Sequence, residues 1–268
     1  MIKNTTIVTA IFDIGRDGWD TYGLSYNTYL HWMRNVLHFD SNIVIYTEEK
    51  FKKFIEDVRK HVDPTLTKTT IIIDEIPNIE SYKLYYSEVK VLMESDEFKK
   101  RIHFNVPEMT KPLYNIIIFN KLFFIKESIE KNYFNSDLFI WCDAGVLSND
   151  IPEIKEGFPN IDKINNGFSD KITFFSHETE FSTPNKDFHL ISQFRYIHGG
   201  CFFVPNNGSI DKIIKSFTKE ITDSLKRGYV GSEEKYLDFC YLEDKTNYNI
   251  AKSDWRQYFD IFGSQILQ

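Results

Sequence analysis

One acidic residue in this sequence stands where ligand-binding groups are often found, directly after a very apolar run. Residues 138–145 read LFIWCDAG, so Asp143 follows a predicted buried strand and precedes two residues with almost no side chain. Those small residues would let a bulky ligand approach the backbone. Asp before a small residue is also a common turn former, and the local pattern fits a turn equally well. We interpret Asp143 as the centre of a candidate active site.

Two further features could serve chemistry near such a carboxylate. Lys121 interrupts an otherwise apolar helix after Asn120, so its side chain either extends to solvent or meets an anion. A glycine pair, Gly199 and Gly200, belongs to a predicted strand, where the alternative is a β-bulge or a tight bend. His198 before the pair is, as an isolated histidine, more typical of a hydrogen-bonded structural residue than of a metal ligand.

Two glutamates, Glu233 and Glu234, open a predicted helix late in the chain. Ser232 before them is a good N-cap, and acidic residues in the first turn interact favourably with the helix dipole. A structural and a functional role are equally compatible with this pattern, because one residue can cap a helix and still face a cleft.

Composition narrows the class of ligand. The chain has 268 residues, 42% of them hydrophobic, which is enough to bury a sizeable core. Its net charge of −7 argues against a nucleic-acid binder, since phosphate contacts need a clustered basic surface. We therefore expect a small ligand. If that ligand is anionic, a bound cation or a few local Lys and Arg residues must supply the positive charge.

Cysteine usage and hydropathy indicate the compartment. Cys142, Cys201 and Cys240 lie far apart and show no CxxC spacing, so neither a disulfide framework nor a zinc site is indicated. No basic segment followed by an apolar core opens the chain, and Asn120 and Lys121 interrupt its most apolar stretch. We expect a cytoplasmic protein without a membrane span. Peripheral membrane association and the oligomeric state remain open.

The candidate residues need elements that bring them together. Short apolar runs that end in turn residues predict strands at residues 6–12, 42–47, 69–73, 138–141, 172–176 and 196–204. Apolar periodicity and capping signals predict helices at residues 25–37, 48–61, 81–101, 114–132, 210–227 and from 232 onward. Tyr26 and Tyr29 belong to the helical face that is expected to pack on the sheet. The alternation predicts one α/β domain with a parallel sheet, whose ligand sites lie beyond the carboxyl ends of its strands.

Three segments carry a resemblance to a known family. They read TIVTAIFDIGR at residues 6–16, NKLFFIKE at residues 120–127 and FIWCDAG at residues 139–145. They resemble the WlaTC/HtrL family of bacterial glycosyltransferase-like proteins over most of the chain. The resemblance implies a GT-A-like single domain over residues 1–268, with a Rossmann-type, mostly parallel sheet flanked by helices. Residues 1–147 would form the nucleotide-binding half and residues 148–268 the acceptor-side half.

The resemblance implies an activity. The enzyme would move a hexose from a nucleotide sugar, expected to be a UDP-sugar, to a hydroxyl group of a glycan acceptor. Mn²⁺ or Mg²⁺ would neutralise the leaving diphosphate as a Lewis acid. One alternative is a catalytically inactive protein of the same fold that binds carbohydrates or nucleotide sugars. Another is a different enzyme on an α/β scaffold, such as a nucleotidyltransferase, although no glycine-rich phosphate loop is visible near the N-terminus.

The resemblance also implies roles for individual residues. Of the DxD signature, Asp143 would represent the last carboxylate and Trp141 would stand in place of the first. Asp254 is the candidate for a second metal ligand, because such domains often end with a histidine ligand and no histidine follows His198; its alternative is an exposed turn. Glu233 or Glu234 would contact the acceptor or act as the base. The donor would be contacted by Thr9, Phe12, Asp13, Arg16, Lys121, Trp141, Gly199 and Gly200.

Overall fold

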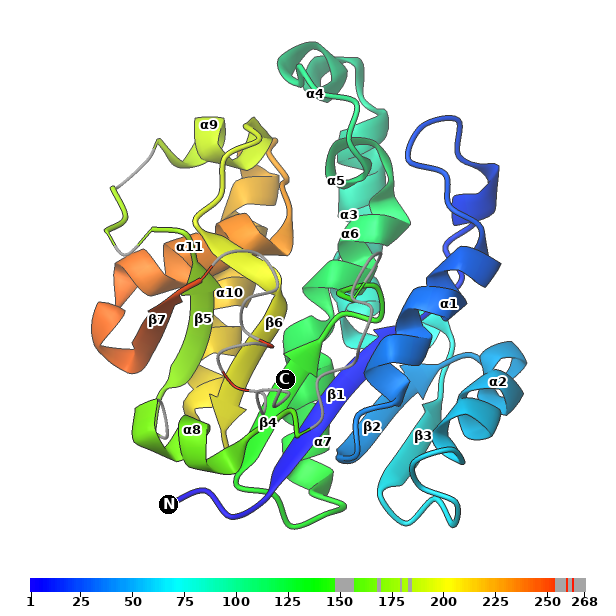
Figure 1. The fold of residues 1–268 in the computed structure, drawn as a ribbon. Coiled ribbons are helices and arrows are strands. Elements are labelled where there is room, and N and C mark those ends of the chain that lie inside the picture. Colours follow the sequence, from blue (N-terminus) through cyan, green and yellow to red (C-terminus); the bar gives the residue numbers. More distant parts are fainter. Residues whose placement is uncertain are drawn as a thin grey trace.

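The computed structural model describes residues 1–147, 157–167, 170–178, 180–182, 185–253, 259 and 262. In these ranges seven strands form one sheet in the order β3-β2-β1-β4-β6-β5-β7, as Figure 1 shows. The strands are β1 (Thr5–Ile11), β2 (Asn42–Thr47), β3 (Thr69–Ile73), β4 (Leu138–Cys142), β5 (Ile172–Ser176), β6 (Ile197–Pro205) and β7 (Tyr248–Lys252).

Strand β6 runs against the direction of the other strands. β1 pairs in parallel with β2 and β4, β2 with β3, and β5 with β7. β6 pairs antiparallel with both β4 and β5. The expectation of an α/β fold with a mostly parallel sheet is confirmed. Because β6 is reversed, its first residues lie at the same edge of the sheet as the last residues of β4.

Helices cover both faces of the sheet (Figure 1). One apolar core contains side chains of α1 (Tyr26–Leu37), α2 (Glu49–Arg59) and α8 (Ile161–Gly167). The core on the other face contains side chains of α3 (Glu80–Glu94), α4 (Asp96–Arg101), α5 (Pro107–Thr110), α6 (Pro112–Phe119), α7 (Lys121–Lys131), α9 (Lys186–Ile191), α10 (Ser209–Lys226) and α11 (Glu233–Glu243). Across the described part of the chain, no helix is both long and apolar enough to cross a membrane.

Several elements differ from the predicted ones, and α5, α8 and α9 are absent from the prediction. The helix predicted at residues 81–101 is two helices, because Ser95 ends α3 and its hydroxyl caps α4 by accepting from the Phe98 N–H at 3.2 Å. The helix predicted at residues 114–132 is likewise divided into α6 and α7 at Asn120. The Asn120 side-chain oxygen accepts from the Ser81 N–H at 2.9 Å, which joins this junction to α3. β7, an edge strand with the mixed sequence YNIAK, is absent from the prediction.

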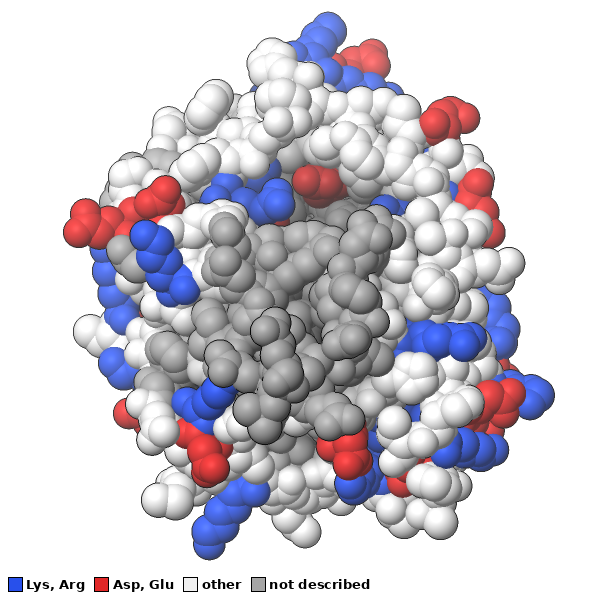
Figure 2. Space-filling model, in the orientation of Figure 1, with Lys and Arg blue, Asp and Glu red and all other residues white. Residues whose placement is uncertain are grey.

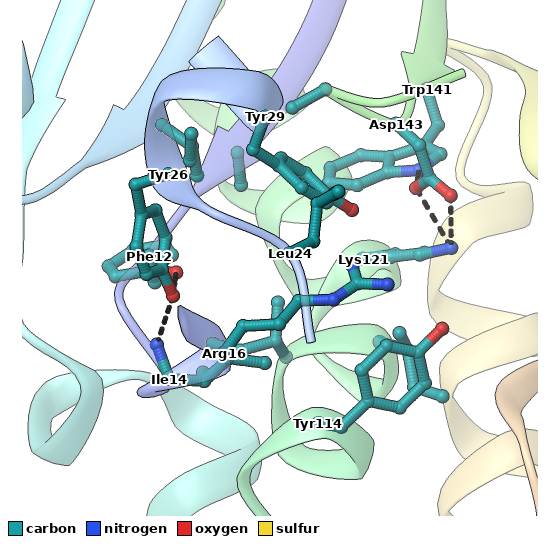
Figure 3. Close-up of a pocket in the computed structure, with 15 residues that line it drawn as sticks. Phe12, Ile14, Arg16, Leu24, Tyr26, Tyr29, Tyr114, Lys121, Trp141 and Asp143 are labelled. Carbon is teal, nitrogen blue, oxygen red and sulfur yellow. Dashed lines mark hydrogen bonds and ion pairs between the residues drawn. The ribbon is translucent and has the colours of Figure 1, made fainter. Parts of the chain in front are cut away.

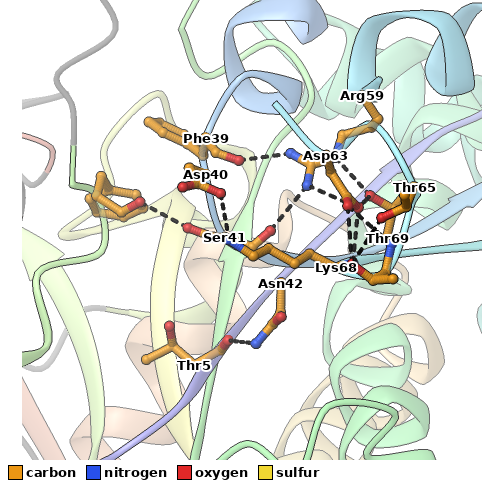
Figure 4. A network of polar contacts seen from close by, with 12 residues as sticks. Thr5, Phe39, Asp40, Ser41, Asn42, Arg59, Asp63, Thr65, Lys68 and Thr69 are labelled. Atoms are coloured by element: carbon orange, nitrogen blue, oxygen red, sulfur yellow. Dashed lines mark hydrogen bonds and ion pairs between the residues drawn. The ribbon is translucent and has the colours of Figure 1, made fainter. Parts of the chain in front are cut away.

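A buried arginine fixes the edge of the sheet where β2 and β3 begin (Figure 4). Arg59 at the end of α2 is fully buried, and its Nη1 donates to the carbonyl oxygens of Leu37 and Phe39, both at 2.7 Å. Its Nε donates to the Thr69 hydroxyl at 2.9 Å. Asp63 accepts from the same hydroxyl at 2.7 Å and so completes the network. One side chain thus connects α1, α2 and β3 at the edge opposite to the carboxyl ends.

Candidate active site at the carboxyl ends of the strands

Asp143 directly follows β4, as predicted, and its orientation is fixed by two neighbours. Its N–H donates to the Gly200 carbonyl at 2.9 Å, which continues the pairing of β4 with β6. Its Oδ1 accepts from the Trp141 indole Nε1 at 2.7 Å. The carboxylate remains about one-third exposed, at 35%. Trp141 itself is buried, so its ring lies behind the carboxylate and orients it.

Lys121 lies at the centre of the site. Its Nζ is 2.9 Å from Asp143 Oδ1, 2.5 Å from Glu233 Oε1 and 3.1 Å from the Gly199 carbonyl oxygen. These three acceptors match the three protons of an ammonium group. The side chain is buried and does not extend to solvent, so the solvent alternative is wrong. Burial disfavours the charged lysine, but Asp143 and Glu233 outweigh this effect and raise the pKa of Lys121.

The two glutamates at the start of α11 both face this site. Glu233 is buried against Lys121, and burial raises its pKa even though the ammonium partly offsets the effect. Glu234 accepts from the Gly199 N–H at 2.9 Å, and its Oε2 forms an ion pair with Arg195, whose Nε lies 2.9 Å away. Burial and the neighbouring Glu233 raise the pKa of Glu234 to about 8. Ser232, the N-cap residue, forms no side-chain cap hydrogen bond.

The glycine pair has a steric role. A Cβ atom on Gly199 would lie 2.5 Å from Glu233 Oε1 and 3.0 Å from Glu234 Cγ, so a side chain there would collide with both glutamates. The β-bulge alternative also holds. The β5 residues Thr173 and Phe175 pair with Phe203 and His198, and β6 therefore carries extra residues between those partners, the glycine pair among them.

Two adjoining cavities meet at Lys121 and Asp143, and Figure 3 shows the residues that line the first. The first, of about 90 Å³, is mostly apolar, and we name it the apolar compartment; among its lining residues are Phe12, Leu24, Tyr26, Ile117 and Trp141. The second, of about 250 Å³, we name the polar compartment; it is lined by Trp32, Glu108, Arg195, Gly200, Glu233 and Glu234, among others. Arg16, Tyr29, Tyr114, Lys121 and Asp143 line both compartments.

The predicted donor-binding residues do not all lie in these compartments. Phe12 lines the apolar compartment, and Arg16 lines both, with its guanidinium carbon 5.1 Å from the centre of the Tyr29 ring. Thr9 is fully buried in β1 and lines neither. Asp13 lines neither as well, and its carboxylate is paired with Lys50 at 2.5 Å. Lys121, Trp141, Gly200, Asp143 and the two glutamates do line the compartments. Gly199 lines neither, but it contacts Lys121 and Glu234 through its backbone.

Several lining residues are not among the predicted site residues. Tyr26 and Tyr29 have the helical spacing of a core face, but the first turn of α1 extends over the strand ends, so their rings line the cleft. Their hydroxyl groups are the sequence signal that could separate them from core residues. Tyr114, Glu108 and Arg195 have no comparable local signal, because elements distant in sequence bring them to the site.

The predicted metal site is described only in part. Asp143 already accepts hydrogen bonds from Lys121 and Trp141, and Asp254 lies outside the described residues. Within the ranges that the structure describes, no group of three or more His, Cys, Asp or Glu side chains is placed to hold a metal ion. The positive charge beside Asp143 is supplied by Lys121.

On the face seen in Figure 2, acidic and basic side chains of the described residues are interspersed over the surface. In this view, blue and red side chains also lie close to one another along the upper border of the grey area. The same mixture is found inside the polar compartment, where Arg195 stands beside Glu234. Local cations therefore accompany the carboxylates in a chain whose net charge is −7.

A family profile described as "Bacterial protein of unknown function (HtrL_YibB)" matches residues 3–264. This chain belongs to that family. Protein HtrL of Escherichia coli (strain K12), whose name the family shares, is 24% identical to it over 283 residues. That alignment covers 98% of this chain and 92% of the E. coli protein. The resemblance noted in the sequence is thus confirmed, and membership of the HtrL_YibB family leaves the activity open.

Solved structures resemble this HtrL_YibB chain more weakly. A galactosyltransferase, LgtC, in complex with donor and acceptor sugar analogs has a TM-score of 0.45 at 10% identity, covering 98% of this chain and 84% of that one. The glycosyltransferase GlyE of Streptococcus pneumoniae TIGR4 has a TM-score of 0.40 at 7% identity, covering 93% and 45%. A 4-diphosphocytidyl-2C-methyl-D-erythritol synthase of Anaerococcus prevotii DSM 20548 has 0.39 at 10% identity, covering 94% and 90%. Scores this low leave activity undecided.

Proposed function

We propose that this protein is a glycosyltransferase that moves a hexose from a nucleotide sugar to a hydroxyl group of a glycan acceptor. The observation that carries the proposal is the pair of adjoining compartments that meet at Lys121 and Asp143. One is lined mainly by apolar and aromatic side chains, and the other contains several carboxylates. A ligand with an aromatic base at one end and a reacting sugar at the other matches this division.

The donor would lie across both compartments. The rings of Phe12, Tyr26 and Tyr114 offer apolar and stacking surface to a base. Among the nucleotide sugars, we expect the donor to be a UDP-sugar. Arg16 borders both compartments, where its guanidinium would pair with the diphosphate. Mn²⁺ or Mg²⁺, held by Asp143 and Asp254, remains part of the proposal and would stabilise the leaving diphosphate.

The transfer needs a group that takes the acceptor proton. The acceptor oxygen attacks the anomeric carbon of the hexose, the bond from that carbon to the diphosphate oxygen breaks, and the hydroxyl proton leaves the acceptor. We assign the proton to Glu234, because a base is most effective when its pKa lies near the working pH, and that of Glu234 is about 8. Glu233 is the less exposed of the two glutamates, at 7% against 17%, and in this proposal it holds Lys121 beside Asp143.

Ligand-dependent stability tests the proposal before an acceptor is known. UDP-, GDP- and CMP-sugars would be compared by thermal shift, each with Mn²⁺ and with EDTA. A ligand that binds the native state raises its stability by about 2.7 kcal/mol at 100 times its dissociation constant. We expect UDP-sugars to raise the melting temperature and to be hydrolysed slowly to UDP. If no sugar nucleotide changes the melting temperature, the proposal is wrong; stabilisation with neither hydrolysis nor transfer would indicate the inactive binding protein.

A further inference from the structure

Arg195, the partner of Glu234, lies on the short connection between α9 and β6. Its side chain is 44% exposed, and its Nε is 2.9 Å from Glu234 Oε2. An exposed arginine on a connecting segment can adopt many conformations, and an ion pair of this kind contributes little unless its geometry is fixed. The backbone on both sides of Arg195 is fixed, however, by hydrogen bonds to two residues of α11 that follow Glu234, namely Lys235 and Asp238.

Lys235 holds the segment before Arg195. Its side chain is buried, and its Nζ donates to the Leu190 carbonyl at 2.8 Å and to the Ser192 carbonyl. Leu190 belongs to the last turn of α9, where carbonyl groups have no partner within the helix. The ammonium therefore ties the end of α9 and the start of the connection to α11.

Asp238 holds the segment after Arg195. It is fully buried, and its Oδ2 accepts from the Tyr196 N–H at 3.1 Å, while its Oδ1 accepts from the Ile197 N–H at 2.9 Å. Its Oδ2 also lies 2.9 Å from His189 Nε2 on α9. Burying a carboxylate is costly, and this one is retained with three polar partners that all belong to the segment from α9 to β6.

We propose that Lys235 and Asp238 are positioning residues, which hold residues 189–197 against α11 so that Arg195 faces Glu234 and governs how readily that carboxylate takes a proton. The inference rests on the proposed function in its assignment of Glu234 as the base. Glu234, Lys235 and Asp238 are neighbours on one helix, so a single element carries both the base and the groups that place its counter-charge.

The direction of the effect follows from the charges that face Glu234. Burial and Glu233 of the same helix raise its pKa, whereas Arg195, the Gly199 N–H of β6 and Lys121 of α7 lower it. If residues 189–197 move away from α11, Arg195 no longer opposes the first two effects. The pKa of Glu234 should then rise above about 8. A shift of roughly one pH unit is expected for losing an opposite charge within about 4 to 6 Å.

Asp238→Asn tests the inference, and the chain offers a matched control. Asp63 is also a buried aspartate that accepts from two backbone N–H groups, at 3.0 and 2.9 Å, but it belongs to the Arg59 network at the opposite edge of the sheet. Asp63→Asn should lower stability in a similar way without any effect on Glu234. Arg195→Met removes the counter-charge directly and should reproduce the effect of Asp238→Asn.

The first measurement needs no substrate. A carboxylate whose folded-state pKa is raised destabilises the folded state as pH rises from its unfolded value toward the folded one. Each protein would be compared with the same protein carrying Glu234→Gln, and we call the first of the two the parent. The melting temperature of the Gln variant minus that of its parent should grow with pH and reach a plateau above about 8. With Asp238→Asn or Arg195→Met as the parent, the plateau should begin roughly one pH unit higher. With Asp63→Asn it should begin where it does in the wild type.

The second measurement is the pH profile of UDP-sugar hydrolysis, whose rising limb should move by the same amount in the same variants. An unchanged plateau in Asp238→Asn, or an equal shift in Asp63→Asn, overturns the inference. If Asp238→Asn does not fold, Lys235→Arg carries the same comparison, because it keeps the positive charge that also acts on Glu234 and changes the geometry of the donor. Absence of hydrolysis in every protein would contradict the proposed function, while the stability plateau would still decide whether Lys235 and Asp238 position Arg195.

Discussion

Lys121 is the residue whose removal should affect this molecule most. Lys121→Met keeps an unbranched side chain but leaves Asp143 and Glu233 without their shared ammonium. Breaking a buried ion pair typically costs about 3 to 5 kcal/mol, and we expect urea denaturation to show a loss of this order. Lys126→Met is the control, because Lys126 makes partly exposed pairs with Glu130 and Asp211, worth about 1 kcal/mol or less. Equal losses in both variants would show that Lys121 is not a structural counter-charge.

Asp143→Asn removes the negative charge at the end of β4 and keeps the shape of the side chain. The amide oxygen can still accept from Trp141, and Lys121 retains Glu233, so the fold should persist. We expect UDP-sugar hydrolysis to fall by at least roughly 100-fold, the size typical of losing one preorganised polar group in an active site. Circular dichroism and steady-state kinetics on the same preparation check both halves of the prediction. Wild-type turnover with unchanged metal dependence would remove Asp143 from the mechanism.

If Glu234 is the base, the activity should increase with pH. A base must be ionised, and a carboxylate whose pKa is about 8 is mostly protonated at pH 7. The value of kcat/KM should therefore rise with pH and level off above about 8. Glu234→Gln should lower turnover by roughly 10² to 10⁴ and remove this limb, while UDP still binds. The exposed Glu130→Gln serves as the control, and a rising limb that survives in Glu234→Gln would assign the proton to another group.

At the scale of elements, the contact between β6 and α11 depends on the absence of a side chain. In Gly199→Ala the new methyl group would lie 2.5 Å from Glu233 Oε1, so the Glu233 side chain or the backbone that carries it must shift. Overpacking of this kind costs about 1 to 3 kcal/mol, and the displaced glutamates should reduce turnover further. Gly18→Ala, where no atom lies within 4 Å of the added carbon, is the matched control. Thermal unfolding and hydrolysis assays on both variants would reveal whether this contact is as tight as described.

For the Arg59 network we predict a loss of stability without a loss of ligand binding. Arg59→Met removes hydrogen bonds to the carbonyl groups of Leu37, Phe39 and Ser41 and leaves Asp63 without its buried partner. We expect the free energy of unfolding to fall by about 3 to 5 kcal/mol. Because the network lies at the edge opposite to the cleft, affinity for UDP in the surviving folded protein should be unchanged. Isothermal titration below the new melting temperature tests this, and weaker binding would mean that the two edges are coupled.

The sequence predicts elements well where their signal is continuous. β1, β2 and β4 are runs of apolar and β-branched residues buried on both faces, and their predicted positions agree with the structure to within about one residue. The breaks at Ser95 and Asn120 are missed because neither residue stops a helical pattern by itself. Ser95 becomes a cap and Asn120 a partner of Ser81 only through contacts that the folded chain provides.

In the site, too, residues with a local sequence signal are predicted, and residues that depend on tertiary contacts are missed. Asp143, Lys121 and the two glutamates are recognisable because each breaks a strong local pattern, at a strand tip, in an apolar helix or at a helix start. Arg195 breaks no pattern, since its role depends on a segment that Lys235 and Asp238 hold from another element. Local signals therefore identify groups that face the cleft, whereas groups that orient them require the tertiary structure.

For the molecule as a whole, the reversed strand determines how the site is assembled. In a fully parallel sheet, only the ends of strands and the connections that follow them reach the carboxyl edge. Because β6 runs the other way, the beginning of a strand reaches that edge too, and Gly199 and Gly200 lie beside Asp143. The direction of β6 is not visible in its sequence, since apolar runs look alike in either direction. The sequence therefore predicts the sheet but not this junction.

Both compartments are lined by the same five side chains, so they cannot fill independently: Arg16, Tyr29, Tyr114, Lys121 and Asp143. A donor that fixes Arg16 and Tyr29 spares the acceptor the entropy of ordering the same groups, which is positive cooperativity without a change of shape. Donor and glycan would then each bind more tightly once the other is in place. Linkage requires reciprocity, so an acceptor must tighten the donor by the same factor by which the donor tightens the acceptor.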